Sequence, residues 1–175
     1  MNKPSIVQLD KHRQEGFRPE ASLCLILDKK ILLVFKKEHK LWQLPQGRIN
    51  NQEEVDTALP RIVKEELGEG VINLVDFSTA KYVEFDQMEF RPGRHEMETL
   101  TDDTGREVPM VGKVYYFVAL QCSSDKLDIT KTQFDQYYWM SSKEAYFLAE
   151  RIYQKGKRRI TMKILDTLFK EQLIT

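Results

Sequence analysis

The chain has 175 residues, enough for one domain with a substantial core and too few for two domains of ordinary size. Apolar residues make up 41% and charged residues 31%, a profile that is typical of a soluble globular protein and excludes an intrinsically disordered one. The 27 basic and 27 acidic residues give a net charge of zero, which predicts no overall attraction to nucleic acid.

The apolar segments are short. The longest runs, Leu23–Leu27 and Ile31–Phe35, are far below the roughly 20 residues that a membrane-spanning helix needs. Met1–Glu15 is polar and lacks the apolar core of a signal peptide, so we expect a cytoplasmic protein without membrane contact. Cys24 and Cys122 lie in or beside apolar stretches, and we expect buried free thiols with no disulfide partner.

The first predicted elements form a β-hairpin. After an N-terminal extension over residues 1–15, Ala21–Leu27 and Ile31–Phe35 are apolar strands joined by a short polar turn. Both strands are nearly continuous in apolar residues, which is typical of a sheet covered on two faces. A loop and a helix follow, and the helix is expected to end at Gly68 or Gly70, where glycine can adopt a left-handed cap.

The middle of the chain contains two candidate strands, Val71–Asp76 and Lys81–Phe85. The segment from Asp86 to Gly112 is polar and rich in proline and glycine, which predicts a long loop. Further strands are predicted at Val114–Leu120 and Phe134–Met140.

The last elements are two helices. Ser141 and Glu144 have capping-box spacing and open a helix that runs through about Ile152. A final helix is predicted from about Arg158 to Leu173, with one apolar stripe formed by Ile160, Ile164, Leu165, Leu168 and Phe169. Strands that alternate with helices, and the absence of repeats and linkers, predict one α/β domain over residues 16–175, with a mixed sheet between helices.

Charge is unevenly distributed along the chain. Between residues 151 and 170, seven basic residues face one acidic residue, Asp166; the basic residues are Arg151, Lys155, Lys157, Arg158, Arg159, Lys163 and Lys170. The segment from residue 53 to residue 69 is its acidic counterpart. An acidic centre beside a basic rim suits a metal ion with a polyphosphate, whereas the alternative is that the basic run is simply the solvated face of a helix.

The spacing of polar residues from Gly47 to Gly68 is specific. Glu53 follows Gly47 by six residues, and Arg61 precedes the pair Glu65-Glu66 in a predicted helix. Adjacent carboxylates repel each other unless a cation or Arg61, four residues before Glu65, intervenes. Mg²⁺ prefers carboxylates together with substrate phosphates. The alternative is an ordinary salt-bridged surface helix. This alternative is less favoured, because Gly47, Glu53, Arg61 and Gly68 all stand at the matching spacing.

This layout resembles the Nudix box, Gly-x5-Glu-x7-Arg-Glu-U-x-Glu-Glu-x-Gly-U, in which U is apolar. Leu41–Ile49 is similar to the Trp-Gln-x-Pro-Gln-Gly-Gly-Ile segment of bacterial RNA pyrophosphohydrolases and dinucleoside-polyphosphate hydrolases. Gly16–Pro19 resembles the Gly-Tyr-Arg-Pro-Asn start of that branch, and Phe134-Asp135 followed by Trp139 resembles its Glu-Phe-Asp-x-Trp-x-Trp segment.

The resemblance implies a Nudix-type α/β/α sandwich that hydrolyses a nucleoside diphosphate-linked substrate, such as a 5′-triphosphorylated RNA end or a dinucleoside polyphosphate. Carried over by position, Glu65 and Glu66 would be catalytic and would bind Mg²⁺ or Mn²⁺. The implied substrate-binding residues are Arg18, Lys36 and Gly47, and the implied bracing residues are Glu53, Arg61 and Gly68.

Three departures from the family pattern bear on catalysis. Ile62 and Gln133 replace two expected acidic residues, and neither side chain can take a proton at neutral pH. Pro60 lies inside the expected helix, where it predicts a kink or a late helix start. Three other carboxylates could supply a relocated ligand: Glu69, which stands where the box has an apolar residue, Glu84 and Glu89.

These observations leave rival hypotheses open. The favoured one is a slow, metal-dependent pyrophosphohydrolase, because metal and electrostatic contributions survive the loss of a general base that is typically worth 10²–10⁴-fold. The second is a catalytically silent Nudix module that binds a nucleotide or an RNA 5′ end. A third is a role in a protein complex without phosphate chemistry.

Overall fold

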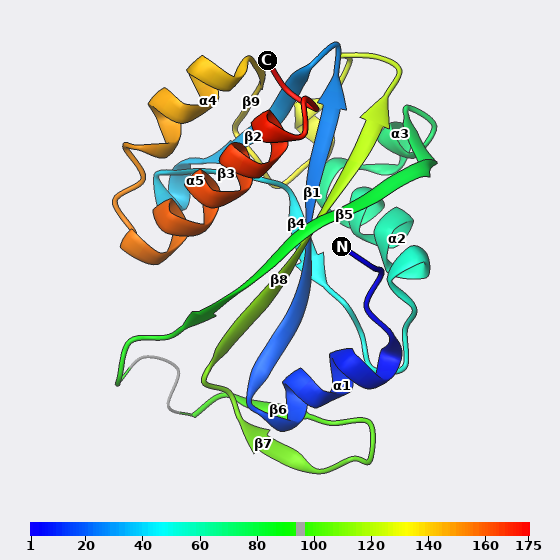
Figure 1. The fold of residues 1–175 in the computed structure, drawn as a ribbon, viewed down its shortest axis with the longest axis vertical. Helices are drawn as coiled ribbons and strands as arrows, with labels where there is room; N and C mark the ends of the chain where they lie inside the picture. Colours follow the sequence, from blue (N-terminus) through cyan, green and yellow to red (C-terminus); the bar gives the residue numbers. More distant parts are fainter. Residues whose placement is uncertain (94–96) are drawn as a thin grey trace.

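The computed structural model describes residues 1–93 and 97–175, and within them a seven-stranded mixed sheet forms the centre of the molecule (Figure 1). Its main path runs β3-β2-β1-β8-β5, while β4 pairs with β1 and β9 pairs with β2. The strands are β1 (Phe17–Leu27), β2 (Lys30–Lys36), β3 (Leu41–Gln43), β4 (Gln46–Arg48), β5 (Val75–Glu89), β8 (Gly112–Cys122) and β9 (Gln136–Met140). β1 and β8 are parallel to each other, and the other strand pairs of this sheet in the described part of the chain are antiparallel.

Helices cover both faces of the sheet (Figure 1). On one face lie α2 (Val55–Leu67) and the short α3 (Glu69–Ile72), and on the other lie α4 (Ser142–Ala149) and α5 (Lys155–Lys170). A further helix, α1 (Ile6–Gln14), and a small hairpin of β6 (Thr99–Thr101) and β7 (Glu107–Pro109) lie at one end of the sheet. Short 3₁₀ turns span Lys37–His39 and Ile129–Lys131. This layering confirms the expected α/β/α arrangement with a mixed sheet.

Two hydrophobic cores explain why the central strands are apolar on both faces. One core joins the sheet to α2 and contains Leu23, Leu25, Leu59, Ile62 and Leu67. The other joins the sheet to α4 and α5 and contains Ile26, Leu33, Phe117, Ile164 and Leu168. The final helix begins at Lys155, and Phe169 is 52% exposed, so the prediction that Phe169 belongs to the apolar stripe is wrong.

The predicted hairpin is confirmed. β1 and β2 pair antiparallel, with Ile26 opposite Ile31. Asp28 and Lys29 both have positive φ angles, 48° and 63°, as the tight turns that match the twist of paired strands require. The capping box that starts α4 is also confirmed, because the side chains of Ser141 and Glu144 cap each other's backbone N–H groups.

The middle of the chain differs most from the predictions. The expected strand at Val71–Asp76 is wrong, because α3 occupies residues 69–72 and β5 begins only at Val75. The segment predicted as a long loop contains the end of β5, the β6–β7 hairpin and the start of β8, and residues 94–96 of it lie outside the described part. β5 alternates polar and apolar residues at the edge of the sheet, and this weaker pattern hides a strand.

Three other predictions have clear outcomes. α2 begins at Val55 and continues through Pro60, so the alternative of a late helix start is wrong. Cys24 is a buried free thiol as expected, while Cys122 is free but only half-buried. None of the described helices is long and apolar enough to cross a membrane.

Candidate functional site

The loop and helix of the box are held together by close packing. A Cβ atom on Gly47 of β4 would lie only 2.9 Å from Cγ1 and Cγ2 of Ile62 on α2, which is too near for any other residue. Ile62 itself is fully buried in the core between α2 and the sheet. The position at which the family pattern has a glutamate therefore carries a packing residue in this chain.

An ion pair braces the loop before α2. Nε of Arg61 donates to Oε1 of Glu53 at 2.8 Å, and Nη2 donates to Oε2 at 2.6 Å and to the carbonyl of Arg48 at 2.7 Å. Glu53 also accepts from the backbone N–H of Asn50 at 2.8 Å. Burial alone would raise the pKa of Glu53, but these donors hold it below its ordinary value. At the far end, α2 stops at Gly68, whose φ of 89° suits glycine.

The two adjacent carboxylates of the box belong to different networks. Glu65 is exposed and accepts from Nη1 of Arg61 at 2.9 Å. Glu66 is half-buried and accepts from Nε2 of Gln133 at 2.7 Å and from the backbone N–H of Gln46. Burial raises the pKa of Glu66 to about 7 against the lowering effect of these bonds. Glu66 can therefore gain or lose a proton close to neutral pH.

Gln133 connects Glu66 to a basic residue. Its Oε1 accepts from Nζ of Lys36 at 3.0 Å, while its Nε2 donates to Glu66. Within residues 1–93 and 97–175, no group of three or more histidine, cysteine, aspartate or glutamate side chains is placed to hold a metal ion. An amide thus stands where the family pattern has an acidic ligand, and it bonds a carboxylate to a lysine.

Two of the three carboxylates that could have supplied a relocated ligand pair with lysines instead. Glu69 is exposed and pairs with Lys64 at 2.9 Å. Glu84 lies 3.7 Å from the ammonium group of Lys163 on α5. Glu89 alone of the three lines the cavity described next.

A cavity of about 620 Å³ opens beside Gln46 and Gln133, on the face of the sheet that carries α5. Among its lining residues are Gln46 and Gln133, which both bond to Glu66. Lysine and arginine outnumber glutamate in the described lining, by six (Arg18, Lys36, Arg91, Lys113, Lys155 and Lys157) to two (Glu89 and Glu98), and this excess points to an anionic ligand. The structure thus places Arg18 and Lys36, two of the residues predicted to bind substrate, at the same cavity, while the third, Gly47, packs against Ile62 of α2.

A buried carboxylate underlies two of these cations. Glu20 is 3% exposed and pairs with Nη2 of Arg18 at 2.7 Å and with Nζ of Lys113 at 2.8 Å. Burial would raise its pKa, but the two cations hold the pKa of Glu20 below its ordinary value. Sequence analysis missed Glu20 and Lys113. The only sequence signal for either residue is a charge within a largely apolar strand. Glu20 lies on β1 and Lys113 on β8, so the two residues meet only when these strands pair.

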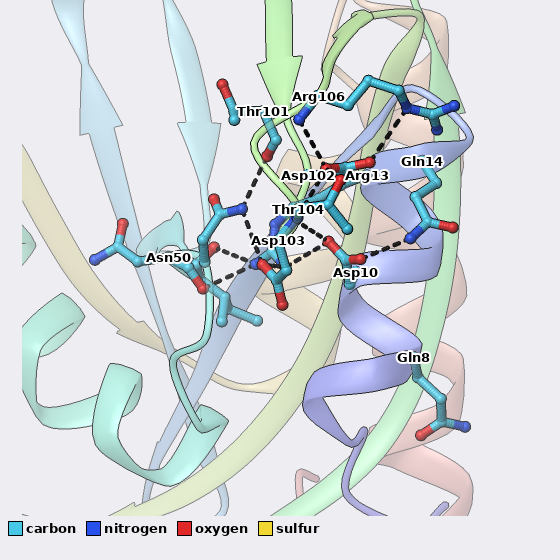
Figure 2. A network of polar contacts seen from close by, with 12 residues as sticks. Gln8, Asp10, Arg13, Gln14, Asn50, Thr101, Asp102, Asp103, Thr104 and Arg106 are labelled. Atoms are coloured by element: carbon cyan, nitrogen blue, oxygen red, sulfur yellow. Dashed lines mark hydrogen bonds and ion pairs between the residues drawn. The ribbon is translucent and has the colours of Figure 1, made fainter.

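The loop that carries Glu53 is also held by α1 and by the turn between β6 and β7, through a network that sequence analysis missed (Figure 2). Arg13 on α1 is 3% exposed, and its Nη2 donates to the carbonyls of Ile49 at 3.1 Å and Asn50 at 2.8 Å. Asp103, between β6 and β7, donates its backbone N–H to Asp10 on α1 at 2.7 Å and accepts from Arg13 at 3.4 Å. The segment predicted as an N-terminal extension therefore contacts the box loop directly.

Comparisons with known proteins agree with this architecture. The family model of the NUDIX domain matches residues 16–163. The dihydroneopterin triphosphate pyrophosphohydrolase of E. coli superimposes with a TM-score of 0.59 at 14% identity, over 86% of this chain and 97% of that one. A NUDIX hydrolase from Nitrosomonas europaea gives a TM-score of 0.56 at 14% identity, over 89% and 90%.

A third similar structure is the NUDIX domain of Shewanella oneidensis NrtR complexed with ADP ribose, with a TM-score of 0.55 at 13% identity, over 89% of this chain and 88% of that one. No curated protein matches the sequence. These varied neighbours, all of low identity, do not single out the RNA pyrophosphohydrolase branch. The match over residues 16–163, together with the fold and the braced box, shows that the chain belongs to the Nudix hydrolase family, whose members act on derivatives of nucleoside diphosphates.

Proposed function

We propose that the protein is a slow, metal-dependent hydrolase of a nucleoside diphosphate-linked substrate. The observation that supports this most directly is the continuity between the basic cavity and the box. Lys36 lines the cavity and bonds Gln133, which in turn bonds Glu66. A diphosphate bound by Lys36 and Arg18 would therefore lie beside the carboxylate that the family uses for catalysis.

The carboxylates fit a metal ion only in part. Mg²⁺ commonly takes one or two carboxylates and completes its shell with water and substrate phosphates. Glu65 and Glu66 would hold such an ion, and substrate phosphates and water would complete its shell, since the described residues contain no group of three or more metal-binding side chains. When bound, the ion would neutralise phosphoryl oxygens and lower the pKa of the attacking water.

The protein's own residues would do the remaining work. Arg18 and Lys36 bind phosphoryl oxygens, and Gln133 and the N–H of Gln46 orient Glu66. Buried Ile62 can accept no proton, so a contribution of about 10²–10⁴-fold from a general base at this position is missing. Slow turnover is the expected consequence.

The decisive experiment measures phosphate and pyrophosphate release from 5′-triphosphorylated RNA and from a dinucleoside tetraphosphate, with Mg²⁺ or Mn²⁺. Native protein is compared with Glu66→Gln, and Glu69→Gln serves as the matched control because Glu69 is exposed at the end of the same box. We expect slow, metal-dependent release that Glu66→Gln abolishes and Glu69→Gln retains. Release that persists in Glu66→Gln would refute the proposal.

A second candidate function is a silent module that binds a nucleotide or an RNA 5′ end. The observation that favours it is the pair of neutral contacts at the acidic end of the box, Gln133 on Glu66 and Ile62 in the core. The NUDIX domain of NrtR was solved with ADP ribose, so a ligand-bound Nudix domain has a structural precedent in this fold. Equilibrium binding of the same ligands without any turnover, in folded protein, would favour this candidate.

A further inference from the structure

We propose that the cavity contains a phosphate-binding subsite at Lys157, formed with Tyr115, Lys113 and Arg18, that holds a phosphate group other than the one beside Glu66. The ligand would therefore carry at least two phosphoryl groups. The identity of this ligand as a nucleotide derivative rests on the proposed function, whereas the subsite itself rests on the geometry described below.

Lys157 contacts β8, and the residue before it packs closely against β5. Its Nζ donates to the hydroxyl of Tyr115 on β8 at 3.1 Å and lies 4.9 Å from the centre of that ring. The preceding residue, Gly156, approaches Met88 of β5 so closely that a Cβ atom would lie 2.9 Å from its sulfur. This close approach lets the first turn of α5 reach the cavity, which Gly156 and Lys157 both line.

The charges around Lys157 do not balance. Glu20 is paired with Arg18 and Lys113, and within the described residues no carboxylate forms an ion pair with Lys157. Three cations therefore share one carboxylate in a half-buried place. Because an unpaired charge is costly away from water, this surplus is best satisfied by a bound anion.

The ionisation of Lys157 points the same way. Burial, and then repulsion by Lys113, lowers the pKa of Lys157 to about 8, with Glu20 acting in the opposite direction and Arg18 adding to the lowering. The hydroxyl of Tyr115 faces the same ammonium group from β8. An anion bound here would restore the charged form of Lys157, so its affinity would fall as the pH rises past 8.

A phosphate group matches this surplus better than a single carboxylate. A phosphate monoester carries between one and two negative charges near neutral pH and has several acceptor oxygens. The subsite lies at the N-terminus of the 16-residue α5, where the N-cap Gln154 makes no side-chain capping bond, and helix N-termini favour phosphates. The second phosphate would lie at Lys36, whose Gln133 contact leads to Glu66.

The test is isothermal titration with inorganic pyrophosphate, in the presence of EDTA, at pH 7 and pH 9. The variants are Lys157→Met, which removes the charge, and Lys157→Arg, which keeps it at both pH values. Lys170→Met, at the exposed far end of the same helix, is the matched control. Unfolding midpoints of all variants establish that each one is folded.

We expect Lys157→Met to bind pyrophosphate about 10- to 100-fold more weakly, the effect of losing one charge-assisted hydrogen bond, and Lys170→Met to bind like native protein. From pH 7 to pH 9 native protein should lose up to about tenfold in affinity relative to Lys157→Arg, because only native protein loses a proton there. The ionisation of pyrophosphate itself affects native protein and Lys157→Arg equally, so it cancels when the two are compared. This comparison also decides the question if Lys157→Met does not fold.

Unchanged affinity in Lys157→Met, or an equal pH response of native protein and Lys157→Arg, would overturn the subsite. The result is independent of catalysis because no divalent metal is present. If Lys157 controls binding while no substrate is turned over, the subsite stands and the hydrolase proposal fails. If turnover depends on Glu66 while the affinity for pyrophosphate does not depend on Lys157, only the subsite proposal fails.

Discussion

The two halves of the Nudix box differ in how closely this chain keeps the family pattern. The bracing half is complete: Gly47 packs on α2, and Glu53 and Arg61 form a two-bond ion pair that also engages the backbone. In the carboxylate half, Ile62 lies in the core, and Gln133 bonds Glu66, the more buried of the two adjacent glutamates.

This difference separates the requirements of folding from those of chemistry. The loop before α2 needs the Glu53–Arg61 pair, because without it a largely buried carboxylate and two backbone groups, the N–H of Asn50 and the carbonyl of Arg48, would lose their partners. The two carboxylates near the end of α2 have fewer such bonds, because exposed Glu65 faces only Arg61, and Glu66 accepts from Gln133 and from one backbone N–H. We therefore expect their loss to disturb the fold less than the loss of the Glu53–Arg61 pair. A sequence match to the box is therefore stronger evidence for the fold than for catalytic activity.

The largest expected effect comes from restoring the family residue with Ile62→Glu. Because residue 62 is fully buried against Gly47, the new carboxylate would be unpaired in the core, and we expect a loss of stability on the order of 3–5 kcal/mol. Denaturant unfolding measures it, with Ile62→Val, expected to cost about 1 kcal/mol, as the control for volume. A stable Ile62→Glu that gains metal binding would show that the two halves are not separate.

A smaller effect is expected within the bracing half. Glu53→Gln removes the charge that faces Arg61 in a side chain only 12% exposed, and we expect a loss of about 2 kcal/mol in unfolding free energy. Glu65→Gln faces the same arginine from a side chain that is 56% exposed, and should cost less than about 1 kcal/mol. Equal losses from the two variants would remove the distinction between the halves.

The smallest effect is a pH dependence of stability that belongs to the carboxylate half. The pKa of Glu66 rises from 4.5 to about 7 on folding, so folded protein binds this proton more tightly than unfolded protein. Its contribution is complete below pH 4.5 and is lost as the pH rises to 7. Because water partly screens this half-buried group, we expect about 1 kcal/mol.

Urea unfolding from pH 4.5 to pH 7.5 tests this by the difference between native protein and Glu66→Gln. The difference should change steadily across that interval, since Gln carries no proton to lose. Other ionisable groups, such as half-buried His12, contribute equally to both proteins and cancel. A constant difference would mean that Glu66 is already ionised throughout.

The features that sequence analysis predicted correctly are those that depend on neighbours in the chain. The β1–β2 hairpin follows from two apolar runs around a turn, and the capping box of α4 follows from Ser141 and Glu144. Glu53 and Arg61 were expected, only by position in the family pattern, to brace the loop and the helix, and the structure shows that they contact each other.

The features that were missed depend on partners far away in the chain. Lys157 belongs to a basic run that fits an exposed helix equally well, and only the packing of α5 on β8 brings it to Tyr115, 42 positions away. The strand β5 was cut short in prediction because an edge strand is half polar, and its pairing with β8 continues to Glu89. No local pattern distinguishes these cases before the sheet is assembled.

The contact between Arg13 and the box loop has a consequence for what counts as one unit in this protein. Arg13 stands three positions before the segment that the family shares, yet its guanidinium group holds the carbonyls of Ile49 and Asn50. A chain shortened to begin at Gly16 would retain every box residue and lose that clamp. The segment that this chain shares with its relatives, residues 16–163, is therefore shorter than the segment that holds the box loop in shape, because the latter includes Arg13.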